Sequence, residues 1–225
     1  MKTVRPGEGE TFDIELEENL LRQNQELALK NRKLLDKKNI HAVDILGSIG
    51  SGKTTLVQQL VSRLQTTYRT ACIAGDLTTT IDADRIAEKG ASVVQANTGK
   101  ECHLDANLVG KALSELDLDN LDLIFIENVG NLICPGEFPV GAHQRIVVVS
   151  TTEGPYMIIK HPYILLESSV LVINKMDLAV AMEVDVHRLR ADALNIKPEL
   201  KVVFTNARSG KGIPELIKSL NLPKK

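Results

Sequence analysis

The residue types best suited to chemistry occur first between Gly47 and Thr54, as Gly-Ser-Ile-Gly-Ser-Gly-Lys-Thr. An apolar run at 42–46 precedes this stretch and a helix-like run at 55–61 follows it, which is the setting of a phosphate-binding loop, or P-loop. Glycine lets such a loop turn so that its N–H groups approach phosphate oxygens, and the following helix presents its positive end to the same anion. We expect Lys53 to reach the outer phosphates of a nucleotide and the Thr54 hydroxyl to hold Mg²⁺. The predicted phosphate-binding residues are Gly47, Gly50, Ser51, Gly52, Lys53, Thr54 and Thr55.

Acidic residues close two of the strands predicted after this loop. Asp76 follows the strand at 69–75, and Glu127 follows the apolar strand at 121–126, with Gly130 three residues further on. In sheets that bind nucleotides, a carboxylate at such a strand end reaches Mg²⁺ directly or through water, and a glycine after it senses the γ-phosphate. The predicted catalytic residues are therefore Lys53, Asp76 and Glu127, and the predicted Mg²⁺ ligands are Thr54, Asp76 and Glu127.

A third polar group, Asn-Lys-Met-Asp, follows the apolar strand at 169–173. Asp177 at its end can accept the N1 hydrogen and the exocyclic amino group of guanine, a pair of donors that adenine lacks. Its neighbours would support the loop and the ring, and a backbone N–H after the strand at 202–205 could meet guanine O6. We therefore expect the nucleotide to be GTP, with base recognition by Asn174, Lys175, Asp177, Asn206 and Ala207.

Cysteine and histidine form a possible metal site. Cys102 and His103 are adjacent, at or just before the start of a helix that apolar residues of period 3.6 predict over 104–116. A thiolate is favoured at a helix N-terminus, and a thiolate with an imidazole is a good ligand pair for nickel or zinc. Two adjacent ligands cannot complete a four-coordinate shell, so another part of the chain or a second copy would supply the rest. Cys134, in a predicted loop four residues after Gly130, is a possible third ligand, although structural roles remain open on the residues alone.

Composition limits the class of protein. A chain of 225 residues buries a substantial core, so no disulfide or metal is needed for folding. The 27 Lys and Arg residues against 29 Asp and Glu lack the basic excess of a nucleic-acid-binding protein. No uninterrupted apolar run approaches the ~20 residues that cross a bilayer, and the start lacks a signal core, so we expect a cytoplasmic location and no membrane contact. The odd number of cysteines, three, argues against a disulfide framework, and Cys72 in mid-strand is expected to be structural.

The elements that must position these residues alternate between strands and helices. This order predicts an α/β fold, a doubly wound and mostly parallel sheet of about seven strands flanked by helices, as in P-loop NTPases, with an N-terminal helix in addition. The predicted strands cover 42–46, 69–75, 92–94, 121–126, 144–149, 169–173 and 202–205. We expect a P-loop GTPase domain at 40–225, preceded by an N-terminal tail and amphipathic helix at 1–39.

The N-terminal helix is predicted from Asp13 to Lys38, a stretch without glycine or proline. Its apolar residues form one stripe, while Asn24 and Asn31 occupy the column where a coiled coil would need a second apolar seam. We expect this helix to dock on the domain or on a partner subunit, with a two-stranded coiled coil as the alternative. Further along, the threonine-rich loop at 77–81 is a candidate switch segment, and Asp82 is expected to cap the helix after it.

The combination of these motifs resembles the HypB family, SIMIBI-class P-loop GTPases that help to insert nickel into [NiFe]-hydrogenase. The resemblance covers about residue 40 to the C-terminus and rests on the P-loop, on residues 75–76, 82–85 and 102–106, on 127–132 with Cys134 and Pro135, and on 174–177. It implies a GTP-dependent homodimer that binds nickel or zinc between its subunits through Cys102, His103 and Cys134. It also implies two kinds of partner, a second maturation factor and the hydrogenase large subunit.

Two departures from the family pattern bear on activity. Many bacterial members begin with a cysteine motif for tight nickel binding, often followed by a histidine-rich run, and residues 1–38 contain neither residue type. Only the weaker metal site of the GTPase domain is then expected. Related dimerising GTPases often place an early lysine in the phosphate loop to reach the partner's nucleotide, where this chain has Ser48, so we expect slow hydrolysis.

Two alternative functions remain compatible with the sequence. One is a related nickel or cobalamin-delivery GTPase that serves urease or a mutase. The other is a P-loop kinase for a small molecule, against which the guanine motif at 174–177 and the lack of an arginine-rich lid both argue.

Overall fold

The computed structural model describes residues 14–76, 81–99 and 101–224. Its centre is a sheet of seven strands in the order β3-β2-β4-β1-β5-β6-β7, and every neighbouring pair is parallel. The strands are β1 (His41–Gly47), β2 (Thr70–Asp76), β3 (Ser92–Asn97), β4 (Leu123–Glu127), β5 (Gln144–Ser150), β6 (Val170–Asn174) and β7 (Lys201–Phe204). The prediction of about seven mostly parallel strands is confirmed, and each predicted strand lies within a few residues of its observed bounds.

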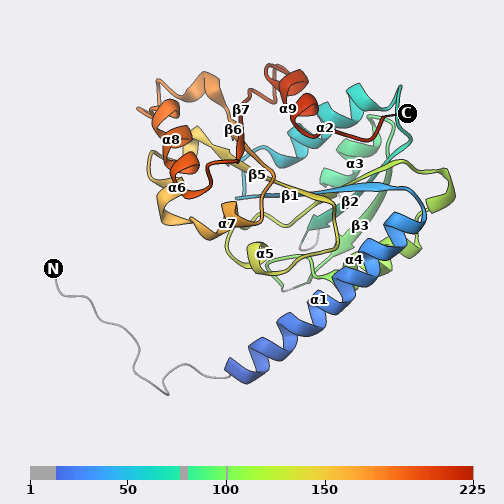
Figure 1. Cartoon of the computed structure of the whole chain (residues 1–225). Coiled ribbons are helices and arrows are strands. Elements are labelled where there is room, and N and C mark those ends of the chain that lie inside the picture. The colour runs from blue at the N-terminus through green and yellow to red at the C-terminus, as the bar shows by residue number, and fades with distance from the viewer. Residues whose placement is uncertain (1–13, 77–80, 100, 225) are drawn as a thin grey trace.

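Helices cover both faces of the sheet (Figure 1). On one face, α2 (Lys53–Leu64), α3 (Ile81–Ala87) and α9 (Ile213–Ser219) share an apolar core with the strands. The other face is covered by α1 (Ile14–Lys37), α4 (Ala106–Ser114), α6 (Met157–Lys160), α7 (Tyr163–Leu166) and α8 (Val186–Ile196). Helices α6, α7 and α8 are additional to the elements that the sequence predicts.

The central strands are nearly continuous apolar runs because both of their faces are buried. All five residues of β4 and of β6 are buried, and so are six of the seven residues of β1. Since all strands are parallel, their carboxyl ends lie along one edge of the sheet, where ligands bind in open α/β sheets. The P-loop, Asp76, Glu127 and Asn174 are therefore brought to the same edge.

Helix α1 packs on its own domain, against α4 and the start of β1. Ala28 and Leu35 are buried in the apolar stripe, as the period predicts, whereas Leu20 is 51% exposed. Asn24 and Asn31 are also buried, and they hydrogen-bond to backbone groups of residues 106, 139 and 140. The asparagine column is thus a polar docking surface, and the first half of the helix extends away from the sheet (Figure 1). The predicted tail at the start of the chain lies outside the described residues.

Two local predictions are wrong. Asp82 does not cap α3, because the helix already begins at Ile81 and Asp82 lies in its first turn, where it pairs with Arg85 at 3.1 Å. Cys134 lies in a helical turn rather than a loop, α5 (Cys134–Glu137). Proline is tolerated there because the first N–H groups of a helix have no partner within the helix. The candidate switch loop lies largely outside the described residues.

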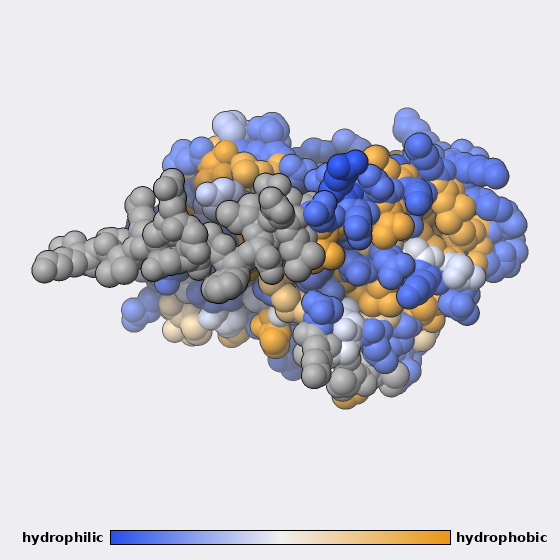
Figure 2. Space-filling view, turned by 90° about the horizontal axis from the view of Figure 1, so that it is seen from below, coloured by the Kyte–Doolittle hydropathy of each residue, from blue (hydrophilic) through white to orange (hydrophobic). Residues whose placement is uncertain are grey.

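Among the described residues, no helix combines the length and apolarity of a membrane span. Seen from below, hydrophilic residues interrupt the apolar ones, apart from the area that the residues drawn in grey cover (Figure 2).

Candidate functional site

The P-loop connects β1 to α2 and is shaped by glycine. Gly52 stands immediately before α2 with φ 99°, a backbone conformation that favours glycine. A Cβ atom at Gly47 would lie 2.6 Å from the Ser51 Oγ and 2.7 Å from the Val148 carbonyl oxygen, so a side chain there would close the loop. The loop therefore fits a phosphate group, with its amides at the N-terminus of a twelve-residue helix.

Lys53 is folded onto the loop that precedes it. Its Nζ donates to the carbonyl oxygens of Gly47 at 3.0 Å and of Ser48 at 3.1 Å. The side chain is 7% exposed, and burial lowers its pKa, while Glu127 opposes this effect. A phosphate group would replace weak carbonyl acceptors with a full negative charge, so the lysine is preorganised for an anion.

Thr54 and Glu127 meet beneath the P-loop. The Thr54 hydroxyl donates to Glu127 Oε1 at 2.6 Å, and Glu127 is only 4% exposed. Burial raises the pKa of Glu127 from 4.5 to about 7. Its Oε2 is buried and has no hydrogen-bond partner among the described residues. A buried hydroxyl and a carboxylate with a free oxygen are hard ligands of the kind that Mg²⁺ takes in nucleotide sites.

These residues line one pocket of about 500 Å³ at the carboxyl edge of the sheet. Asp76 lies at the end of β2 on its wall, as the sequence predicts, and Gly130 lies beside the exposed Ile49 at the tip of the P-loop. Lys53, Thr54, Asp76 and Glu127 are thus brought together, and Lys175 approaches from the base side.

Asn174 joins the P-loop to the predicted base-binding loops. Its Nδ2 donates to the Ser51 carbonyl oxygen at 2.8 Å, and its Oδ1 accepts from the Thr205 hydroxyl at 2.9 Å and the Ala207 amide at 3.0 Å. The supporting role proposed for Asn174 is therefore direct, and it extends to two loops at once. Asp177 lies in the exposed 3₁₀ turn Met176–Leu178, with its carboxylate free to meet a base edge.

The loop at 206–207 departs from the expected geometry. The Ala207 amide is bonded to Asn174, and the Asn206 amide donates to the Lys211 carbonyl oxygen at 3.0 Å. Either amide would have to exchange its present acceptor before it could meet guanine O6.

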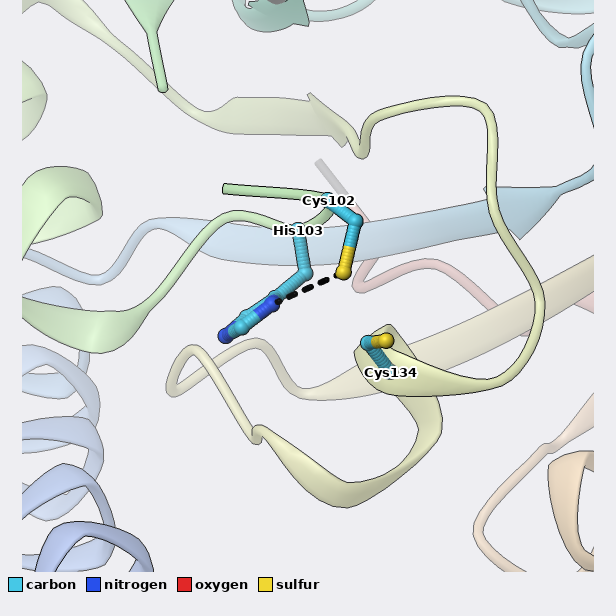
Figure 3. Close-up of side chains that lie close together, drawn as sticks. All are labelled: Cys102, His103 and Cys134. Carbon is cyan, nitrogen blue, oxygen red and sulfur yellow. Dashed lines mark hydrogen bonds between the residues drawn. The ribbon is translucent and has the colours of Figure 1, made fainter. Parts of the chain in front are cut away.

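The two cysteines and the histidine converge in space. Cys102 and His103 lie in the segment before α4, and Cys134 opens α5 opposite them (Figure 3). One ligand atom from each residue lies within 4.8 Å of the others, and the Cys102 Sγ is 3.8 Å from His103 Nδ1. No other group of three such ligands occurs among the described residues. The structure thus assembles the three residues from two distant segments of the chain.

The electrostatics of this cluster favour the uncharged forms of Cys102 and His103, so the thiolate expected from a helix N-terminus is not favoured before a metal binds. The neighbouring Cys134 side chain and then burial raise the pKa of the Cys102 thiol, and burial lowers the pKa of His103. A neutral imidazole is the form that binds metal, and a cation that displaces the thiol protons would relieve the crowding of the two sulfurs. The donor set of two sulfurs and one nitrogen fits nickel or zinc and leaves one position open in a four-coordinate shell.

Several residues of the site were not predicted from the sequence. Asn131 bridges the P-loop and the metal cluster, because its backbone pairs with Gly47 and its Nδ2 donates to the Cys102 carbonyl oxygen at 3.4 Å. The Phe138 ring lies 4.0 Å from the His103 ring, centroid to centroid. Glu153 lies near Ser48, and burial raises its pKa. Of these three residues, only Glu153 could have been predicted from the sequence, since it ends a polar run directly after a buried strand.

The remaining cysteine and two other histidines lie apart from this site. Cys72 is fully buried within β2, as expected of a structural residue. His41 and His143 stack with ring centroids 4.7 Å apart near the start of β1, and the His143 Nε2 lies 2.9 Å from Asp36. They support the junction between α1 and the sheet.

A parallel α/β sheet with a P-loop after its central strand, a buried Thr–Glu pair beneath the loop and an Asn-Lys-x-Asp turn define the P-loop NTPase class. Residues 41–204 match the CobW/HypB/UreG nucleotide-binding domain family. The chain is 50% identical to the probable hydrogenase maturation factor HypB of Methanocaldococcus jannaschii over 204 residues, which cover 91% of this chain and 92% of the relative. It belongs to the HypB family, as the motifs predict.

Solved structures agree with this assignment. HypB from Archaeoglobus fulgidus superposes with a TM-score of 0.83 at 40% identity. The superposition covers 88% of this chain and 97% of the A. fulgidus chain. HypB from Helicobacter pylori in complex with nickel superposes with a TM-score of 0.83 at 30% identity and covers 88% and 93%.

Proposed function

We propose that this protein is a GTP-hydrolysing metallochaperone that assists nickel insertion into [NiFe]-hydrogenase. In this proposal Cys102, His103 and Cys134 bind nickel, or zinc in its place, at an interface between two subunits. The observation that carries the proposal is the convergence of these three ligands beside the nucleotide pocket. The names of the HypB relatives and the nickel in the H. pylori protein support the metal and the recipient.

GTP is proposed as the nucleotide because Asp177 lies exposed in the 3₁₀ turn Met176–Leu178, where its carboxylate could accept both donors of the guanine edge. Lys53 would leave the carbonyl oxygens of the P-loop for the outer phosphates. Thr54, with Asp76 and Glu127 directly or through water, would hold Mg²⁺, which neutralises developing phosphate charge when bound. In the empty pocket burial raises the pKa of Glu127 to about 7, so binding of Mg²⁺ there would favour the deprotonated carboxylate.

The ligand count is the reason for proposing a dimer. Three ligands leave the metal shell incomplete, and the cluster includes the exposed Cys102 and lies next to the exposed Ile133. A second copy related by a two-fold axis would bring its own cysteine and histidine side chains to the same place, from which the open position could be filled. GTP would favour this dimer by ordering the loops after Asp76 and Glu127, and hydrolysis would relax them and release the nickel.

The partners and the location are proposed on the same basis. A second maturation factor and the hydrogenase large subunit would present the metal to this protein or receive it. This exchange of metal would take place in the cytoplasm. Neither nucleic acid nor membrane is part of the proposed mechanism.

The test is nickel and zinc binding by the purified protein with GDP and with a non-hydrolysable GTP analogue, together with its mass in solution. We expect tighter or altered metal binding and dimer formation in the GTP-analogue form. Cys102→Ala should remove this binding, whereas Cys72→Ala, which removes a buried thiol elsewhere, should retain it. Equal binding by the wild type and Cys102→Ala would refute the metal site, and a monomer in both nucleotide forms would refute the switch.

A further inference from the structure

A buried polar group contacts both segments that carry the metal cluster. It consists of Asp44 on β1, Asn128 directly after β4 and Arg145 on β5, which we call the buried triad. Asp44 and Asn128 are each 1% exposed, and Arg145 is 8% exposed. Burying an ion pair at this depth is weak evidence for stability, because desolvation offsets most of the attraction. A role in fixing geometry is therefore the better explanation, and the contacts of the triad identify what it holds.

The first contact is with the segment that carries Cys102 and His103, which we call the first arm (102–106). The Asn128 Oδ1 accepts the Leu104 amide at 2.9 Å, one residue after His103, and the Val129 amide at 3.0 Å. Leu104 itself is fully buried against Gly75, where a Cβ atom on the glycine would lie 2.8 Å from the leucine side chain. Asn128 therefore sets the position of the first arm.

The second contact is with the segment that carries Cys134, which we call the second arm (134–138). The Arg145 guanidinium donates to the Gly136 carbonyl oxygen at 3.0 Å and to the Phe138 carbonyl oxygen at 3.5 Å. These two carbonyls follow Cys134, and the Phe138 ring packs on His103. Arg145 therefore sets the position of the second arm.

The two contacts are joined at Asp44. Arg145 Nε donates to Asp44 Oδ2 at 2.9 Å, and the Asn128 side chain faces Asp44 closely enough to lower the pKa of that carboxyl, although burial raises it overall. Asp44 Oδ1 and Asn128 Nδ2 are both buried without another hydrogen-bond partner among the described residues. These two atoms make no ordinary hydrogen bond to one another, so the junction consists of the Arg145–Asp44 ion pair and the close approach of the Asn128 side chain to Asp44.

The nucleotide pocket adjoins the same junction through the backbone. Glu127, which binds Thr54, is the residue before Asn128, and the Asn128 amide donates to the Ile45 carbonyl oxygen at 3.0 Å. Any change at Glu127 when Thr54 takes its ligand is thus one peptide bond from the side chain that holds the first arm.

We propose that Asn128 and Arg145 are positioning residues for the metal cluster, and that Asn128 transmits the state of the nucleotide pocket to it. This inference rests on the proposed metal site. It adds that the nucleotide pocket and the metal cluster are coupled through the buried triad, in addition to the direct chain connection from Gly130 to Cys134. A metal ligand shell held by such residues tolerates their loss poorly, with affinity falling by about 10- to 100-fold when an outer partner is removed.

The test compares Arg145→Lys and Asn128→Ala with the wild type. Lysine can keep the ion pair with Asp44 as a point charge, but it cannot span the two carbonyls of the second arm. Arg69→Lys is the control for the loss of a guanidinium group, since Arg69 pairs with Asp122 through two nitrogens just before β2, with a side chain that is 54% exposed. Nickel is titrated into each protein without nucleotide, with GDP and with a non-hydrolysable GTP analogue, and the sulfur-to-nickel charge-transfer band is recorded.

We expect Arg145→Lys and Asn128→Ala to lower nickel affinity by about 10-fold or more and to shift the charge-transfer band. They should also bring the ratio of nickel affinities in the two nucleotide forms toward one, while Arg145→Lys keeps its affinity for the GTP analogue. If Arg145→Lys changes neither the nickel affinity nor the ratio of nickel affinities in the two nucleotide forms, the inference is overturned. This result is decisive even if Asn128→Ala does not fold. Nickel binding by the wild type that depends on Cys102 would then still uphold the metal site, whereas its absence would overturn both proposals.

Discussion

Glu127→Gln tests how strongly burial raises the pKa of the Glu127 carboxyl in the nucleotide pocket. The carboxyl is 4% exposed, and burial raises its pKa from 4.5 to about 7 despite the hydrogen bond from Thr54 and the charge of Lys53. Between these two pH values the folded protein holds a proton that the unfolded chain has released, so stability falls as the pH rises. Each pKa unit corresponds to about 1.4 kcal/mol, so the unfolding free energy of the nucleotide-free protein should fall by about 3 kcal/mol across this range.

The glutamine variant keeps the acceptor for the Thr54 hydroxyl and lacks the ionisation. We expect it to match the wild type near pH 4.5 and to be more stable by up to about 3 kcal/mol above pH 7. The assay is denaturant unfolding from pH 4.5 to 8.5 in the presence of a chelator and without nucleotide. Glu199→Gln, at a site where the side chain is 73% exposed, is the control and should follow the wild type at every pH. A stability difference for Glu127→Gln that does not change with pH would refute the reasoning.

Three further predictions concern separate parts of the molecule. Asp177→Asn should weaken GTP binding and favour xanthine nucleotides, because the amide offers a donor where guanine also donates; unchanged GTP affinity by calorimetry would contradict the base assignment. Asn31→Ala should lower the unfolding free energy by about 2 kcal/mol, since it leaves buried backbone carbonyls without donors. Gln25→Ala on the exposed side of the same helix should cost little, and equal losses would argue against asparagine docking. His41→Gln should reduce the loss of stability as the pH falls from 6.5 to about 4, because burial and the charge of His143 lower the pKa of His41. If the unfolding free energy of the variant falls as steeply as that of the wild type over this range, the site is solvated.

Local sequence was sufficient for the nucleotide pocket because each of its motifs is tied to a strand end. In a parallel sheet all carboxyl ends share one edge, so Lys53, Asp76 and Glu127 had to meet once the strands were recognised. The apolar period of α1 likewise predicted a docked face. It did not predict that Asn24 and Asn31 are the docking contacts, because their backbone partners are distant in the chain.

The sequence by itself determined the class of protein and the phosphate loop, because these depend on residue types at short spacings from which local geometry follows. The set of three candidate metal ligands came from the resemblance to the HypB family, since Cys134 is distant in the chain from Cys102 and His103. Only the tertiary structure decided that Cys134 faces Cys102 and His103, and that Asp44, Asn128 and Arg145 hold the two arms between which the metal would bind. Those contacts join strands and loops that are far apart in the chain, and their positions follow from sheet order and core packing rather than from any local pattern.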